Sequence, residues 1–405
     1  MEYKIERLAA KDYDELLGML NTVFHKPEGN TFDVFLPVMW ERDDEHMSKH
    51  IAIKEDGKIS AVVGIYPLPA NVCGEKIVFS TIGNVATLPE CEGRGMMKAL
   101  MTRSLEEAKK MGIDIARLAG ARQRYNRYGF EHAGAHYLFK LIPKNLIDYY
   151  GGKETDGELV CRGSVLSGGE GFEKRFEFKQ VTLDTPELLD EVMELEKNAP
   201  LYAERGDRVQ FFKTLSAYKH KIWGALNGDK LVGYMCVTPD NAYIYEHRAT
   251  DPDTEYQMLL DWLIFGGAKE INIHIAPWET KLSSKLMAIC EKWSIYNTSM
   301  FHVFSWSKVL NALLKIRSKY TVIPEGSLVI EIEGYGRIEL SGDKCTDTDK
   351  EPQMTLSQIE ATRFILGSMP AASVCELPDD LDAQTIVYIQ SVLPLPLWWC
   401  NQDRV

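Results

Sequence analysis

Two glycines in a short polar turn, Gly93 and Gly95, stand between an apolar extended run and an amphipathic helical pattern. The run ends at Pro89, and the helical pattern begins at Met96. Glycines at a strand-to-helix turn leave backbone N–H groups uncovered, and the helix dipole favours negative charge at that end. The pattern therefore predicts a site for a phosphate-bearing ligand. Glycines that only shape a turn would give the same short motif, so the reading depends on its context.

A second candidate for chemistry is Tyr125, the first residue of Tyr125-Asn-Arg-Tyr-Gly-Phe130. A phenol with a pKa near ~10 stays protonated at neutral pH and can donate its proton to a leaving group. The structural alternative is a ring that packs against the sheet, which is what we expect of Tyr128 and Phe130.

The last fifteen residues are unusually apolar and aromatic, with Trp398 and Trp399 side by side and Val405 at the end. A frayed terminus would be polar. We therefore expect this segment to be packed inside the protein.

A dense acidic patch follows an aromatic stretch near the N-terminus: Glu41, Asp43, Asp44 and Glu45. Such a patch could attract a polycationic amine, although a charge run is more often only a solvated face.

Two histidine pairs, His46/His50 and His132/His136, have i, i+4 spacing. Neither pair is accompanied by a glutamate-flanked zinc motif, and both straddle an expected loop or strand. We predict no metal site.

The elements that must position these groups can be read from periodicity. A helical pattern at 9–24 follows a short strand at 3–8, and apolar alternation on either side of Asp56-Gly57 predicts a hairpin. A helix from Met96 should stop at Gly112. Further strands are expected at 76–88, 113–118 and 136–142, which together predict an α+β sheet domain.

The same order of elements recurs later in the chain. Residues 220–237 parallel residues 50–65, and a strand and a helix follow each. This is an internal repeat. The second copy's turn reads Asp251-Pro-Asp-Thr-Glu255, with no glycine and three carboxylates where phosphates would lie. The second copy should have the fold without the anion site.

The pattern changes near residue 300, where an apolar stretch from Phe301 precedes a stretch from Gly326 that alternates apolar and charged residues, as in a half-buried sheet. We predict three domains, over residues 1–148, 149–299 and 300–405.

Composition describes an ordinary globular protein: 405 residues, 45% hydrophobic and 26% charged. The formal net charge of −13 argues against a nucleic-acid or anionic-membrane binder. Scattered cysteines without a CxxC pair, a charged start and no long apolar run predict a cytoplasmic protein with reduced thiols.

The first 140 or so residues resemble GNAT-type (Gcn5-related) N-acetyltransferases. The resemblance rests on Gly83-Asn-Val-Ala-Thr87 leading to Gly93-Arg-Gly95, and on Tyr125-Asn-Arg-Tyr-Gly-Phe130. The loop Glu92-Gly-Arg-Gly-Met-Met97 departs from the family's usual pattern at its first and last positions. The whole chain resembles the enhanced-intracellular-survival (Eis) acetyltransferases, which implies an α+β fold of tandem GNAT domains followed by a sterol-carrier-protein-like α/β domain.

This resemblance implies acetyl-CoA as co-substrate. Its pantetheine would run along the strand at 85–87, and its pyrophosphate would rest on amides of 93–98. The residues implied to bind it are Val85, Ala86, Thr87, Gly93, Arg94, Gly95, Met96, Met97, Lys98, Gly120 and Ala121. Tyr125 would be the general acid, and the terminal carboxylate of Val405 would be the base, unless it is an ordinary packed terminus.

The activity implied is direct acetyl transfer to a primary amine (an aminoglycoside-like compound, a polyamine or a lysine side chain) by a homo-hexamer. An enzymatic alternative is a tandem-GNAT aminoacyl or acyl transferase. An alternative of another class is a non-catalytic acyl-CoA or lipid-binding protein.

Overall fold

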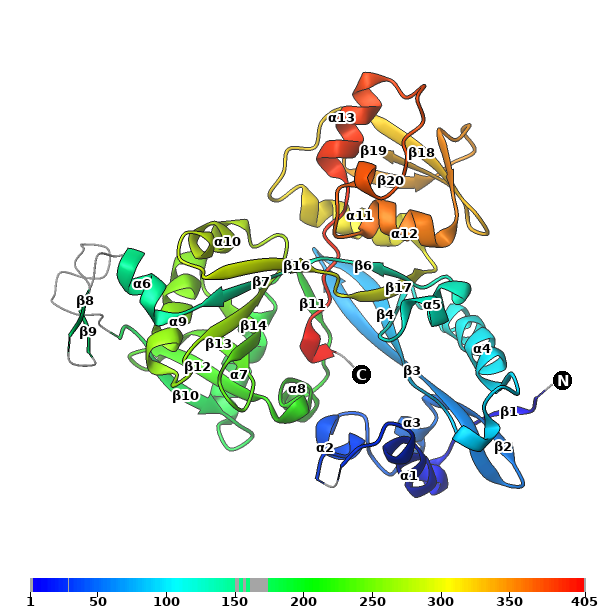
Figure 1. Cartoon of the computed structure of the whole chain (residues 1–405), viewed down its shortest axis with the longest axis horizontal. Helices are drawn as coiled ribbons and strands as arrows, with labels where there is room; N and C mark the ends of the chain where they lie inside the picture. The colour runs from blue at the N-terminus through cyan, green and yellow to red at the C-terminus, as the bar shows by residue number, and fades with distance from the viewer. Residues whose placement is uncertain (1–2, 28, 150–152, 156–157, 161–173, 404–405) are drawn as a thin grey trace.

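The computed structural model describes residues 3–27, 29–149, 153–155, 158–160 and 174–403. Three sheets, each covered by helices, form three lobes that meet near the end of the chain (Figure 1). This mixed α/β architecture agrees with the predicted fold class at that level. Within the described residues, no helix has both the length and the apolar character needed to cross a bilayer.

The first sheet has the order β1-β2-β3-β4-β5-β17-β6, with β11 paired to the far end of β3. Its strands are β1 (Ile5–Arg7), β2 (His50–Glu55), β3 (Lys58–Val72), β4 (Glu75–Thr87), β5 (Ile115–Leu118), β6 (Glu131–Ala133), β11 (Leu201–Ala203) and β17 (Ser299–Val303). Asp56 and Gly57 both have positive φ angles at the β2–β3 turn, which confirms the predicted hairpin.

Alternating side chains of β3 enter two different cores. Val63 and Ile65 pack on the face covered by α4 (Met96–Lys110), whereas Val62 and Tyr66 pack on the face covered by α1 (Tyr13–Val23). The period of two along the strand thus buries both faces of the first sheet.

The second sheet has the order β10-β12-β13-β14-β15-β7-β16. Its strands are β10 (Glu177–Val181), β12 (Lys221–Asn227), β13 (Lys230–Val237), β14 (Tyr243–Ala249), β15 (Ile271–Ile275), β7 (His136–Leu141) and β16 (Lys292–Tyr296). The series β12-β13-β14-α9-β15 repeats β2-β3-β4-α4-β5, with α9 (Pro252–Phe265) in the place of α4. The internal repeat predicted from sequence is confirmed in the order of its elements.

One expectation about the first sheet is corrected. The strand predicted at 136–142 forms as β7, but it lies in the second sheet, between β15 and β16. In exchange, β17 enters the first sheet between β5 and β6. Both strands are apolar enough to fit either sheet, and periodicity does not specify the partner of a strand. β7 therefore precedes the predicted boundary at 148 but lies in the second sheet, and β17 begins at the predicted boundary of 299 but lies in the first sheet.

The third sheet has the order β20-β19-β18-β21 and packs against α11 (Trp306–Arg317), α12 (Gln358–Leu366) and α13 (Ala383–Val392). Its strands are β18 (Ser327–Ile332), β19 (Gly336–Ser341), β20 (Lys344–Asp347) and β21 (Met354–Leu356), and a separate pair is formed by β8 (Lys153–Thr155) and β9 (Glu158–Val160). The α-helices not yet given are α2 (Phe32–Phe35), α3 (Asp44–Met47), α5 (Arg122–Tyr125), α6 (Pro143–Tyr149), α7 (Pro186–Glu196), α8 (Arg208–Leu215) and α10 (Thr280–Met287).

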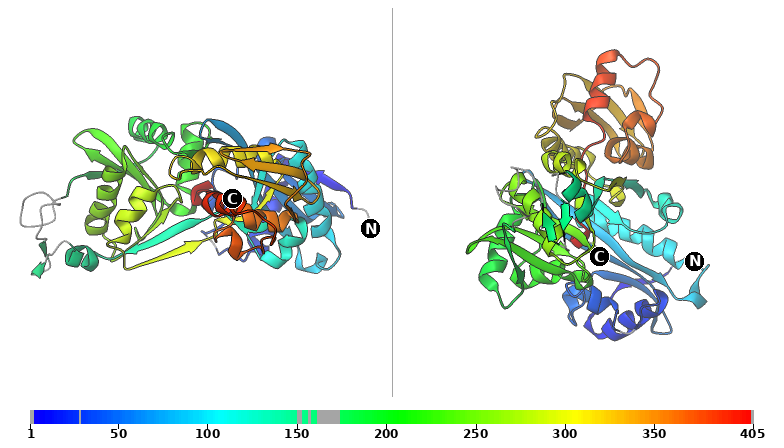
Figure 2. Two further views of the ribbon diagram at one scale, coloured as in Figure 1. Left: turned by 90° about the horizontal axis from the view of Figure 1, so that it is seen from above. Right: turned by 60° about the vertical axis from the view of Figure 1, so that its left-hand side comes forward.

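After α13 the chain leaves the third lobe and runs down between the other two (Figures 1 and 2). Backbone hydrogen bonds hold it on the way, from Leu395 N to Ile365 O and from Ala135 N to Leu397 O. It ends in the short helix η6 (Asn401–Asp403), which contacts α8 and β14. The prediction that the apolar tail is packed inside the protein is confirmed for the residues up to Asp403.

Candidate active site

An open strand edge lies at the centre of the first sheet. Parallel pairing between β4 and β5 covers only Phe79 to Thr81 of β4, opposite Ile115 to Arg117 of β5. The residues of β4 after Thr81, up to Thr87, have no partner on β5, so their backbone groups on that side are open. An extended ligand that carries amides can pair with such an edge as an added strand would.

The open edge leads to the N-terminus of α4. Gly93 and Gly95 both have left-handed backbones, with φ of 74° and 83°, and an added Cβ at either would meet nothing within 4 Å. The glycines are thus needed for the turn itself and not for space. No side chain caps α4, whose N-cap is Gly95, so its first N–H groups are left for an anion.

The corresponding end of the second copy is closed. The carboxylate of Asp251 caps α9 by accepting hydrogen bonds from Asp253 N at 2.9 Å and Thr254 N at 3.0 Å. A side-chain anion therefore occupies the place that a phosphate would take, as the sequence predicts.

Side chains at the loop have separate tasks. The Arg94 guanidinium pairs with Glu55. The backbone carbonyl of Arg94 accepts a hydrogen bond from the Tyr3 hydroxyl at 2.6 Å. Met96 is buried in the core beneath α4, whereas Lys98 is exposed. Because the Arg94 side chain is paired, the loop offers an anion mainly its backbone.

The three predicted pantetheine residues alternate across β4. Val85 packs toward α4, and Ala86 packs toward α1. The hydroxyl oxygen of Thr87 is buried and has no hydrogen-bond partner among the described residues. An unsatisfied buried hydroxyl at the end of an open strand edge fits a polar ligand group there.

Tyr125 lies on α5, which follows β5, and its side chain is buried in the core beneath α4. Its ring sits over Gly120, where an added Cβ would come within 2.6 Å of the ring carbon Cε2. Ala121 is the extended residue that starts α5, the turn that carries Tyr125. Burial raises the pKa of the Tyr125 phenol, while neighbouring Arg124 acts in the opposite direction. The phenol therefore stays protonated at neutral pH and is a proton donor.

A buried polar network, which sequence reasoning missed, supports β4 from the other face. The Asn84 amide donates to the Tyr66 hydroxyl at 2.6 Å, and that hydroxyl lies 2.6 Å from His50 Nε2. Burial lowers the pKa of His50 to about 4, so its imidazole is neutral at pH 7. Asn84 also has a positive φ of 51°, next to a shift in the β3–β4 register. An asparagine inside an apolar strand was the available signal.

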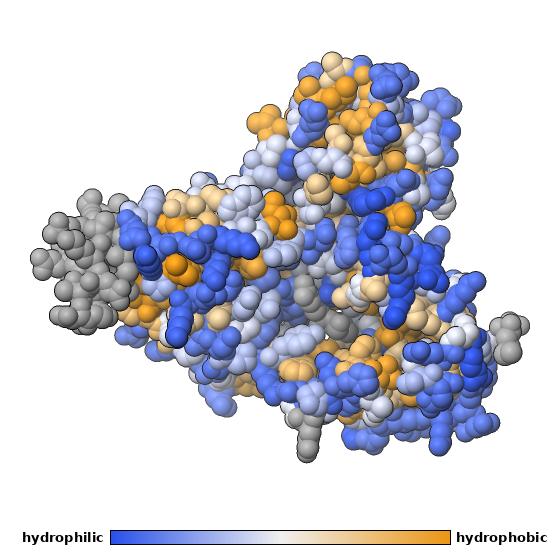
Figure 3. Space-filling model, viewed as in Figure 1, coloured by the Kyte–Doolittle hydropathy of each residue, from blue (hydrophilic) through white to orange (hydrophobic). Residues whose placement is uncertain are grey.

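A cavity of about 240 Å³ opens beside this network. It is lined by α3, β3, the first turns after β11 and the tail helix η6, and the view in Figure 3 shows the molecule hollowed where the lobes meet. Its polar lining residues include Glu45, His46, Lys49, Thr81, Glu204, Arg205, Gln402 and Asp403. The sequence predicted the acidic stretch near this place but not the groups from β11 and the tail.

The tail is held at this cavity by a buried arginine. Arg205 donates to Asp403 through Nε at 2.7 Å and to Glu246 through both terminal nitrogens, and it also pairs with Glu196 at 2.8 Å. Burial raises the pKa of Glu196 to about 8, and the nearby charges of Glu246 and Asp403 add to this rise, whereas Arg205 opposes it. The pKa of Glu246, which takes two of the arginine's hydrogen bonds, falls to about 2.

Val405, the predicted base, lies outside the described residues. Two residues earlier, Asp403 is fully described and its backbone carbonyl accepts a hydrogen bond from Trp399 Nε1 at 3.1 Å. Trp398 packs edge-on against Trp278 and lies under the Arg248 guanidinium. The sequence's paired tryptophans are thus the anchor of the tail.

Comparison with known proteins agrees with this geometry. Residues 4–133 match the family model described as an acetyltransferase (GNAT) domain. No curated protein sequence matches the chain.

Solved structures with similar folds cover almost the whole chain. A GCN5-related N-acetyltransferase from Anabaena variabilis superposes with a TM-score of 0.67 at 15% identity, covering 98% of each chain. A probable N-acyltransferase of unknown function from Enterococcus faecalis gives 0.64 at 15%, covering 92% of each. Eis1 from Mycobacterium abscessus gives 0.64 at 13%, covering 98% of each. At these identities the likeness is one of fold, and it extends through all three lobes. The family match assigns residues 4–133 to the acetyltransferase (GNAT) domain model, and the solved structures support the fold of the whole chain.

Proposed function

We propose that this protein is an acetyl-CoA-dependent N-acetyltransferase that transfers the acetyl group directly to a primary amine. The observation that carries the proposal is the open edge of β4, which leads to the uncapped N-terminus of α4, together with Tyr125 in the core beneath α4. An amide-bearing arm that ends in phosphates fits the first two features, and a thiolate leaving group fits the third.

In this reaction the amine nitrogen attacks the thioester carbonyl carbon, the new C–N bond forms and the C–S bond breaks. The departing thiolate takes the phenol proton of Tyr125, whose raised pKa keeps it protonated until that moment. Two protons leave the original ammonium: one replaces the phenol proton, and the other is released to solvent. A base is therefore needed on the acceptor side, and we propose the terminal carboxylate of Val405 for one of these transfers.

The acceptor would enter through the 240 Å³ cavity. Glu45 is exposed there and Glu204 carries only a long contact of 3.4 Å with Lys76, so both can attract a cationic amine. This favours polyamines, aminoglycoside-like compounds or lysine side chains.

Three finer features complete the proposal: an Eis-type enzyme, a third domain of the sterol-carrier-protein type and a cytoplasmic homo-hexamer. The exposed apolar side chains of Trp293, Ile295 and Tyr296 lie on β16, an edge strand of the second sheet, and would be covered by another copy. Light scattering on wild type and Trp293→Arg tests this, since a monomeric wild-type protein would contradict it.

The activity is tested by thiol release from acetyl-CoA with a panel of polyamines, aminoglycosides and lysine peptides. We expect release to depend on both amine and enzyme, with the acetylated amine found by mass spectrometry. Acetyl-CoA binding without transfer to any amine would instead support the alternative, a non-catalytic acyl-CoA-binding protein. Acceptance of only longer acyl or aminoacyl donors would support the other transferase reading.

The base assignment is tested separately. Deleting Val405 or adding one glycine after it moves the carboxylate, so we expect turnover to fall by about 10²-fold or more while acetyl-CoA affinity is retained. Unchanged turnover in both variants would remove Val405 from the mechanism.

A further inference from the structure

We propose that His46, oriented by Asp43, is the catalytic base that takes the first proton from the incoming acceptor ammonium. This assignment rests on the proposed acetyl transfer, and it names the residue that deprotonates the acceptor. The second proton, lost after the C–N bond forms, is left to the carboxylate proposed at Val405.

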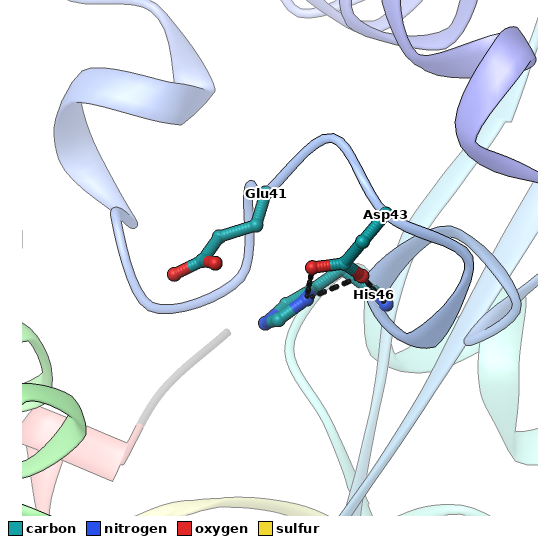
Figure 4. A group of neighbouring side chains, drawn as sticks. All are labelled: Glu41, Asp43 and His46. Carbon is teal, nitrogen blue, oxygen red and sulfur yellow. Dashed lines mark hydrogen bonds and ion pairs between the residues drawn. The ribbon is translucent and has the colours of Figure 1, made fainter.

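The geometry of the pair fixes which ring nitrogen is free. His46 Nδ1 lies 2.8 Å and 2.9 Å from the two oxygens of the Asp43 carboxylate. Beside an ionised carboxylate Nδ1 carries the hydrogen, which leaves the Nε2 lone pair as the acceptor. Figure 4 shows Nε2 on the side of the ring that points away from Asp43.

The Asp43 and His46 side chains are held in place by the backbone at the start of α3. Asp43 is the N-cap of α3, and its Oδ1 also accepts a hydrogen bond from His46 N at 2.7 Å. His46 is only 8% exposed and lies on the short helix that follows the cap. Both partners are therefore held before any ligand arrives, as an oriented base requires.

The location of the pair joins it to the donor site. His46 lines the 240 Å³ cavity, and so do Tyr66 and Thr81. Thr81 is the last residue of β4 that pairs with β5, so the cavity reaches the point where the open edge begins. Tyr66 of β3 lines the cavity, and its hydroxyl accepts a hydrogen bond from Asn84, which lies beyond Thr81 on β4. An amine in this cavity thus approaches the donor strand with His46 beside it.

Most other titratable groups at this cavity are paired, buried or exposed to water. Asp403 is bound to Arg205. Glu41, which approaches His46 from the preceding loop, pairs with Lys213, and this ammonium also disfavours a metal ion in the group of Glu41, Asp43 and His46. His50 directs Nε2 at the Tyr66 hydroxyl inside the buried network. Lys49 is a cation and Glu45 is exposed to water.

The proton balance is complete without a further reactant. His46 Nε2 accepts one proton from R–NH3+, giving R–NH2 and an imidazolium. The free amine attacks the thioester, and the imidazolium later releases its proton to solvent through the cavity. An acceptor that is already neutral at the assay pH does not need this step.

The test compares two primary acceptors of similar size, an alkylamine that is protonated at neutral pH and an alkoxyamine that is neutral. His46→Gln retains an N–H donor for Asp43 but has no basic nitrogen. We expect its kcat/KM to fall by about 10²-fold or more with the alkylamine and to change little with the alkoxyamine. Deletion of Val405 should lower both rates. Asp43→Asn, which can still cap α3, should show the same split as His46→Gln to a smaller degree.

His25→Gln, an exposed histidine in the loop after α1, is the matched control. Thermal unfolding and acetyl-CoA affinity should be the same for wild type and all these variants. Equal losses with both acceptors would make His46 a structural group, and undiminished alkylamine turnover in His46→Gln would remove it from the reaction; either result overturns the assignment alone. Wild-type protein that acetylates neither acceptor would overturn the proposed function itself, and this assignment with it.

Discussion

Tyr125 is the residue whose surroundings most clearly match a task. Its ring is packed over Gly120, so its hydroxyl has a fixed direction at the end of β5, and its burial disfavours the phenolate. A group held in this way donates a proton without first having to be ordered. Tyr128, three residues later, is only half-buried and packs in the same core.

Tyr125→Phe removes the proton donor and keeps the ring. We expect kcat to fall by about 10²-fold, with the KM for acetyl-CoA within a few-fold of wild type, because the loss concerns the leaving group alone. Steady-state thiol release measures both constants. Tyr128→Phe is the matched control and should retain wild-type kcat; a similar loss in both variants would contradict the role of Tyr125.

At the scale of elements, the site is a consequence of how β4, its loop and α4 follow one another. The loop turns through two glycines in the left-handed region and delivers an uncapped helix N-terminus to the end of an open strand. The second copy has the same elements in the same order, but Asp251 caps its helix. In the second copy, one capping carboxylate thus takes the position that we propose for a phosphate in the first.

Gly95→Ala tests the loop. An alanine at φ 83° costs about 1–2 kcal/mol in backbone strain and turns the first N–H groups of α4 away from a phosphate. We expect the KM for acetyl-CoA to rise by about tenfold, as the loss of one charge-assisted hydrogen bond would produce. Gly334→Ala, at φ 78° on the β18–β19 turn of the third sheet, carries the same strain away from the loop. This control variant should lower thermal stability similarly and leave the KM for acetyl-CoA unchanged. A raised KM in the control would contradict the role of the Gly93–Gly95 loop in binding the phosphates.

At the scale of the whole molecule, the cavity of about 240 Å³ exists because three parts of the chain meet. It takes α3 and β3 from the first lobe, Arg205 from the segment after β11, and η6 from the tail that crosses from the third lobe. Arg205 joins them by binding Glu196, Glu246 and Asp403 together. The exchange of β7 and β17 between sheets adds a second tie between the first two lobes.

The arginine cluster makes stability depend on pH. The pKa of Glu196 rises from 4.5 in the unfolded chain to about 8 in the folded protein, so between these values the folded state binds the extra proton. The free energy of unfolding therefore decreases as the pH rises through this window, by about 1.4 kcal/mol for each unit of pKa displacement at most. Glu196→Gln should flatten this dependence in urea unfolding, whereas the exposed Glu194→Gln should follow wild type. Parallel curves for wild type and Glu196→Gln would show that Glu196 is already ionised.

The local features of this protein can be predicted from its sequence. Glycine spacing, β-branched runs and helical periodicity are read within about twenty residues, and they predict the β4–α4 turn, the β2–β3 hairpin and the repeat without its anion site. The apolar pair Trp398-Trp399 likewise predicts a buried tail, since apolar area must be removed from water wherever the partner lies.

Which strands share a sheet, and which side chains share a cavity, depends on the tertiary fold. The pairing of β7 with β15 joins residues more than a hundred positions apart, and strand pairing has no signature that names a distant partner. The meeting of Asp403 with Arg205 spans 198 positions, and His46 faces the same cavity from the first lobe. A pattern along the chain records the needs of each segment for burial and hydrogen bonds, whereas a site depends on which segments satisfy those needs together.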